Sequence, residues 1–124
     1  MGYLAKSTQI LASALLVGCA TNGGNFAAVF TSPKSLEGQT VTQCGFLQYE
    51  FENVNFYPNR RQAKKGESGV GVSPGNISDS ELSNHHNQTV CLTGQVRYAG
   101  CSVTMICTGS NFLYEIIVDD LKVR

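Results

Sequence analysis

The sequence predicts a small all-β domain with one short helix. Apolar and polar residues alternate at a period of two in several short runs, which is the spacing of strands with one buried face. Glycine and proline separate these runs: Pro58, Pro74-Gly75 and Gly100 each follow an expected strand. A chain of 124 residues has room for one domain, so the expected strands have to share one core. A small β-sandwich is the alternative architecture.

Three strands are expected in the first half of the domain. The first runs from Gln39 to Phe51 and is rich in β-branched and aromatic residues. Gly45 lies in its middle, where glycine often marks a bulge or a bend. A second, short strand covers residues 55–57, and Val70-Gly-Val72 indicates a third. The charged residues 59–66 between them are expected to form a loop.

One helix and two strands are expected in the second half. Residues 76–87 are polar, and Ser78 or Asp79 is a suitable N-cap for a short helix there. The clearest strand of the chain follows, because apolar and polar residues alternate without a break over residues 90–98. The last strand is expected over residues 114–123.

This order of elements resembles the OB-fold, a five-stranded Greek-key barrel. The long first strand with Gly45 at its centre resembles the first strand of that fold, and Val90-x-Leu-x-Gly-x-Val96 resembles its fourth. The resemblance spans about residues 36–124. It implies a closed barrel similar to lipid-anchored, OB-like envelope domains.

The N-terminus has the features of a bacterial export signal. Lys6 supplies one positive charge, and the apolar stretch from Ile10 to Gly18 is too short for a lasting transmembrane helix. The segment Leu16-Val17-Gly18-Cys19 resembles the lipobox of bacterial lipoproteins. The resemblance implies cleavage between Gly18 and Cys19, with lipid on Cys19. An ordinary secretory signal with a chance cysteine is the alternative.

The same resemblance predicts the location and the domain boundaries. Ala20 after the lipidated cysteine implies sorting to the outer membrane, with the domain facing the periplasm. We therefore expect a signal over residues 1–18, a lipidated tether over 19–35 and a barrel domain over 36–124. The patch Phe26–Phe30 is too apolar for a linker, so we expect it to pack on the domain; contact with lipid or a partner is the alternative.

Five cysteines are many for a chain of this length. If Cys19 is lipidated, an even number is left in an exported domain, which is typical of two disulfides. A zinc site is disfavoured because the chain contains no C-x-x-C. In the barrel that the OB resemblance implies, the first and fourth strands are antiparallel neighbours, and each has a cysteine on its polar side. We therefore expect the pairs Cys44–Cys91 and Cys101–Cys107.

The sequence contains no catalytic motif. It has no G-x-S-x-G, no glycine-rich phosphate loop and no H-E-x-x-H. His85 and His86 are adjacent in a polar stretch, which makes them a poor chelating pair. Glu50 and Glu52 fit the polar side of a strand better than an acid–base pair. We predict that the protein is not an enzyme and has no metal and no cofactor.

Binding is the functional class that the sequence favours. The candidate surface combines strand aromatics with the cations of the charged loop: Tyr49, Phe51, Tyr57, Arg60, Arg61, Lys64 and Lys65. Nine basic and nine acidic residues balance, which argues against nucleic acid as the partner. The leading hypothesis is an anchored accessory module that binds another envelope protein. The alternative is a binder of a small ligand or a cell-surface glycan through the aromatic strand face.

Overall fold

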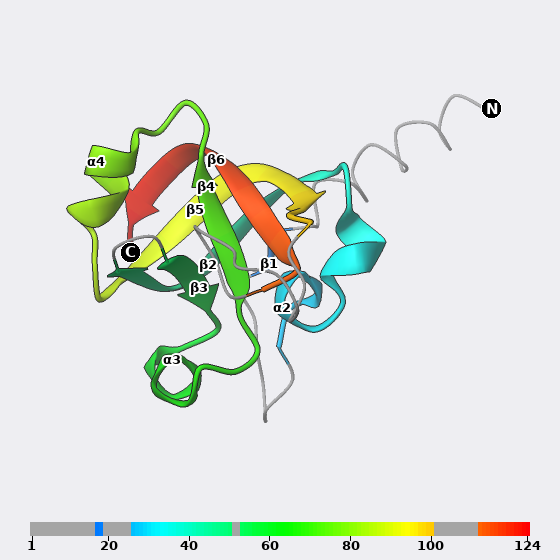
Figure 1. The fold of residues 1–124 in the computed structure, drawn as a ribbon, viewed down its shortest axis with the longest axis horizontal. Coiled ribbons are helices and arrows are strands. Elements are labelled where there is room, and N and C mark those ends of the chain that lie inside the picture. Colours follow the sequence, from blue (N-terminus) through cyan, green and yellow to red (C-terminus); the bar gives the residue numbers. More distant parts are fainter. Residues whose placement is uncertain (1–16, 19–25, 51–52, 101–111) are drawn as a thin grey trace, which may run out of the picture.

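The computed structural model describes residues 17–18, 26–50, 53–100 and 112–124. Within them, one strongly curved sheet closes into a barrel (Figure 1). Its strands are β1 (Val17–Gly18), β2 (Thr40–Glu50), β3 (Asn53–Tyr57), β4 (Val70–Pro74), β5 (Gln88–Tyr98) and β6 (Tyr114–Val123). The strand order is β1-β2-β3-β4-β6-β5, and β5 pairs back with β2. Strands β2 to β6 therefore form the five-stranded, OB-like barrel that the sequence predicts.

Glycines let the strands approach closely at two points of the barrel. The pairing of β5 with β6 shifts register between Thr93 and Gly94, and a Cβ on Gly94 would lie 2.0 Å from the carbonyl oxygen of Ile117. In β2, a Cβ on Gly45 would lie 2.4 Å from the carbonyl oxygen of Tyr57. The pairing of β2 with β5 continues through Gly45 without a register shift, so this glycine allows close approach rather than a bulge.

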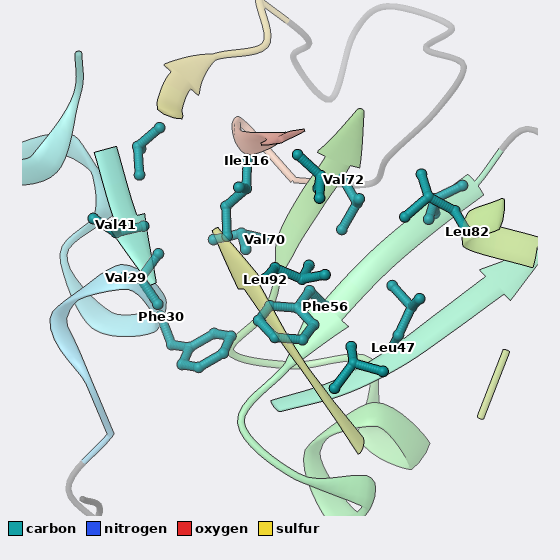
Figure 2. Close-up of a cluster of buried hydrophobic side chains, with 14 of the residues drawn as sticks. Val29, Phe30, Val41, Leu47, Phe56, Val70, Val72, Leu82, Leu92 and Ile116 are labelled. Atoms are coloured by element: carbon teal, nitrogen blue, oxygen red, sulfur yellow. The ribbon is translucent and has the colours of Figure 1, made fainter. Parts of the chain in front are cut away.

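The interior of the barrel is filled by apolar side chains from all five of its strands and from three short helical segments, one of them a 3-10 helix (Figure 2). Leu47, Phe56 and Leu92 are completely buried. Helix α4 (Asp79–Ser83) is the short helix predicted between the third and fourth strands of the barrel, and its Leu82 is also completely buried. The hydroxyl of Ser78 accepts a hydrogen bond from the amide of Glu81 at 3.1 Å, so Ser78 is the N-cap.

The segment before the barrel packs into the same core. Residues Ala28–Thr31 form α2 and residues Pro33–Leu36 form the 3-10 helix η1. The rings of Phe30 and Phe56 lie 5.5 Å apart, and Val29 is buried as well. The expectation that the Phe26–Phe30 patch packs on the domain is therefore confirmed, and the packed chain begins before residue 36.

Strand β1 adds a short parallel pairing to β2. Val17 lies opposite Thr42 and Gly18 lies opposite Gln43. The five-stranded barrel closes without this pair, because β2 and β5 already pair with each other. No helix in the described residues is both long and apolar enough to cross a membrane.

The outer side of the β2–β5 pair carries the predicted disulfide. Cys44 and Cys91 lie opposite each other in the antiparallel register and are bonded. On the same side, the hydroxyls of Thr42 and Thr93 form a hydrogen bond of 2.9 Å. The predicted pair Cys101–Cys107 and the predicted lipidation site Cys19 lie outside the described residues.

The expectation of a loop over residues 59–66 is wrong, because residues Arg60–Lys65 form helix α3. The side chain of Asn59 caps its N-terminus by accepting a hydrogen bond from the amide of Gln62 at 2.9 Å. Gly66 ends the helix in the left-handed region at φ 69°, where glycine is unstrained. Asn59 and Gly66 are residue types that commonly cap a helix. The sequence nevertheless suggests a loop, because four of the six residues between Asn59 and Gly66 are charged.

Candidate functional site

Tyr57, predicted to belong to an exposed binding surface, is buried. Its side chain is 3% exposed, and its ring meets Phe112 edge-on at 5.8 Å. Burial also raises the pKa of its phenol. Tyr57 is therefore a packing residue, and the aromatic strand face is closed at this position. Phe51, the neighbouring candidate, lies outside the described residues.

Tyr49 forms hydrogen bonds with residues of α4 and of the turn after it. Its hydroxyl donates a hydrogen bond of 2.5 Å to Asp79, and its backbone amide donates one of 2.9 Å to Nδ1 of His86. The hydrogen bond to Asp79 raises the pKa of Tyr49. Figure 1 shows α4 well separated from α3. The structure therefore does not bring Tyr49 together with the cations of α3.

Helix α3 is docked on the outer side of the barrel. Phe46 and Tyr57 lie opposite each other in the β2–β3 register and share one face, whereas their neighbours Leu47 and Phe56 point into the main core. Phe46, Tyr57 and Ala63 form a second, smaller buried cluster. Ala63 is thus the residue through which α3 packs on the barrel.

The four cations of α3 divide into two pairs. Residues four positions apart lie on one side of a helix, and each step along the helix turns by about 100°. Arg60 and Lys64 therefore share a side next to Ala63. Arg61 and Lys65 share another side, opposite Ala63, and point away from the barrel. All four side chains are exposed.

A pocket of about 270 Å³ lies beside the first pair. Its lining residues come from three segments of the chain: Phe46, Gln48, Arg60, Ala63, Lys64 and Asn87. The guanidinium carbon of Arg60 lies 5.3 Å from the centre of the Phe46 ring, a cation–π distance. The pocket therefore has an apolar floor and a cationic rim.

None of the four cations of α3 forms an ion pair with another residue in the described part of the chain. Four of the nine basic residues lie in this one helix, which contains no acidic residue. The one ion pair in the described residues joins Arg97 to Glu115, on β5 and β6. A protein of zero formal net charge thus presents a local cationic surface.

The sequence indicated all four cations of α3, of which Arg60 and Lys64 line the pocket, but it did not indicate the other lining residues. Phe46 carried a signal, because two adjacent apolar residues, Phe46 and Leu47, interrupt the strand alternation. Gln48 and Asn87 had no such signal in the sequence. They lie close together only because the fold places the turn before β5 next to β2. In the described residues, no group of three or more His, Cys, Asp or Glu side chains is placed to hold a metal ion.

Comparisons with known proteins give one structural likeness to report. No family model matches the chain, and no curated protein matches it either. Among solved structures, the chain is similar to the OBody AM3L15 bound to hen egg-white lysozyme. That match has a TM-score of 0.47 and 14% sequence identity, and covers 73% of this chain and 84% of the other.

Proposed function

We propose that this protein is a lipid-anchored, non-catalytic module of the bacterial envelope that binds an acidic surface of another envelope protein through Arg61 and Lys65. The observation that carries the proposal is the positive charge of α3, which forms no ion pair in the described residues. Arg61 and Lys65 point away from the barrel, and packing and caps hold their helix in place. Complementary charge of this kind orients a partner and speeds its association.

The fixed position of α3 supports binding more than the number of charges does. An exposed ion pair contributes at most about 1 kcal/mol, partly because ordering long side chains costs entropy. Asn59 and Gly66 define the ends of α3, and Ala63 fixes it to Phe46 and Tyr57. The backbone that presents Arg61 and Lys65 is therefore already ordered before a partner arrives, which lowers the cost of binding.

The proposed anchor limits where the partner can be. If lipid is attached to Cys19, the residues from there to Phe26 span at most about 25 Å when extended. The chain is packed against the barrel from α2 onwards. The barrel would therefore stay near the membrane surface. Cleavage after Gly18 would remove β1, but the five-stranded barrel would keep all its pairings.

Cross-linking in the cells that encode the protein tests this proposal. A C-terminally tagged protein should capture one dominant envelope protein, and the variant Cys19→Ala should lose it. The double variant Arg61→Glu/Lys65→Glu should also lose the partner while its melting temperature stays unchanged. The matched control is Lys122→Glu/Arg124→Glu, which makes the same charge change at two exposed residues near the C-terminus. Unchanged capture by the α3 variant would contradict the proposal.

A further inference from the structure

We propose that the pocket between α3 and β2 binds a small carboxylated sugar of the uronic acid type. This inference goes beyond the docking role, because it rests on Arg60 and Lys64 rather than on the outward pair. The size, the charge, the polar groups and the apolar floor of the pocket each restrict the ligand.

The size of the pocket restricts the ligand to a small molecule. Its volume is about 270 Å³. Pockets for drug-sized ligands usually measure ~300–1,000 Å³. A single sugar ring with one substituent suits the smaller volume, whereas a folded peptide segment or a long oligosaccharide would extend beyond it. The pocket is therefore suited to one terminal or free sugar unit.

The charge of the pocket calls for an anion. Arg60 and Lys64 are its charged lining residues, and no carboxylate lines it. Neither cation forms an ion pair with another described residue. A guanidinium binds a carboxylate through two parallel hydrogen bonds, and the neighbouring ammonium adds a third donor. A carboxylate at this rim would neutralise charge that the protein leaves unpaired.

Two side-chain amides of the pocket can form hydrogen bonds with the hydroxyl groups of a sugar. Gln48 and Asn87 line the pocket, and each amide offers both a donor and an acceptor. In the described structure, neither side chain has a hydrogen-bond partner. The backbone of Asn87 is held in place, since its amide donates a hydrogen bond of 2.8 Å to the carbonyl oxygen of Leu47. Vicinal hydroxyls of a sugar both donate and accept, so they can use both functions of each amide, whereas sulfate can only accept hydrogen bonds.

The floor of the pocket is apolar. Phe46 and Ala63 form it, each 6% exposed, and the guanidinium of Arg60 lies against the Phe46 ring. The C–H groups of a pyranose can contact the exposed edge of this floor while its hydroxyls point towards the rim. The cationic rim, the side-chain amides and the apolar floor together favour a carboxylated sugar over a simple anion or a neutral sugar.

Titration of the folded protein with glucuronate, followed by amide NMR spectra, tests this inference. We expect saturable shifts of the side-chain amide signals of Gln48 and Asn87. Glucose lacks the carboxylate and inorganic phosphate lacks the ring, so each should bind at least about tenfold more weakly. Absence of saturable shifts with glucuronate, or equal binding of glucose, would overturn the proposal. Binding of phosphate as tight as that of glucuronate would reduce the pocket to a simple anion site and would overturn it as well.

Two matched variants separate this site from the proposed docking surface. Arg60→Gln/Lys64→Gln should weaken glucuronate binding at least about tenfold, because it removes both cations of the rim. Arg61→Gln/Lys65→Gln makes the same charge change on the outward side and should leave glucuronate binding within about twofold. Equal loss in the two variants would contradict a specific pocket. Partner capture in cells, measured on the same variants, should follow the opposite pattern, so either proposal can fail without the other.

Discussion

The two halves of β2 complete their outer faces in different ways. In the first half, Thr42 and Cys44 face the matching residues of β5 and form a hydrogen bond and a disulfide. In the second half, Phe46 faces outward beside Tyr57, and helix α3 covers both. The small polar residues of the first half are half-buried, and no helix of the described residues lies over them, so we call this the bare half of β2; the half with Phe46, which lies under α3, is the covered half. That cover brings the cations and the pocket to this side of the molecule.

Of the changes that test this comparison, removal of the disulfide should lower the free energy of unfolding the most. Cys44 and Cys91 are 47 residues apart in the sequence, so their bond restricts the unfolded chain over a long loop. The double variant Cys44→Ala/Cys91→Ala should lose about 2–4 kcal/mol of unfolding free energy in urea denaturation. The chemical environment of α3 should stay the same in its NMR spectrum. A loss below about 1 kcal/mol would show that the bare half of β2 is held mainly by its backbone ladder.

Removing the aromatic side chain under α3 should have the second largest effect on the free energy of unfolding. Phe46→Ala should cost about 3 kcal/mol, because Ala63 and Tyr57 lose the surface against which they pack. Hydrogen exchange should accelerate selectively in the amides of α3. Thr42→Ala on the bare half of the strand serves as the control, with an expected cost of about 1 kcal/mol and no change in α3. Uniform acceleration across the barrel would contradict a separate helical cover.

Removing the N-cap of α3 should have a smaller and more local effect. Asn59→Ala should cost about 1 kcal/mol, because the amide of Gln62 loses its acceptor. Hydrogen exchange at Gln62 reports this change directly. Asn76→Ala, an exposed asparagine outside the helix, should stay within about 0.5 kcal/mol of the parent protein. Equal effects of the two substitutions would mean that the cap does not hold the helix.

Removing β1 should have the smallest effect. A chain without residues 1–18 should differ by less than about 1 kcal/mol, because the two residue pairs of β1 gain little beyond the entropy of ordering it. Urea denaturation of the two chains measures the difference. A loss above about 2 kcal/mol would make β1 part of the fold and would argue against cleavage after Gly18.

The bare half of β2 is the half that the sequence predicts well. Strict alternation in β5 places Val90 and Leu92 inside and Cys91 outside. Together with the strand order that the OB resemblance implies, this is enough to predict the disulfide. The succession of five strands along the chain, with a helix between the third and the fourth, follows from the same periodicity and from glycine and proline, whereas their arrangement in the barrel is what the OB resemblance implies.

The covered half is harder to predict, for two physical reasons. Helix α3 has Ala63 as its one buried residue, so it lacks the apolar stripe by which helices are normally identified. Its signals are the caps Asn59 and Gly66, which a highly charged segment obscures. Tyr57 has the strand position of a ligand-stacking aromatic, but the protein covers it with its own helix. Such a tertiary contact has no local signature in a sequence.

Site-specific photo-cross-linking in living cells tests the central claim, that α3 presents the partner-binding surface, most directly. A photoreactive amino acid at Glu67, exposed just beyond α3, leaves all four cations in place; the same amino acid at exposed Asp120 on β6 is the control. The account predicts one cross-linked envelope protein from position 67 and none from position 120. No product at position 67, or the same product from both positions, would contradict it.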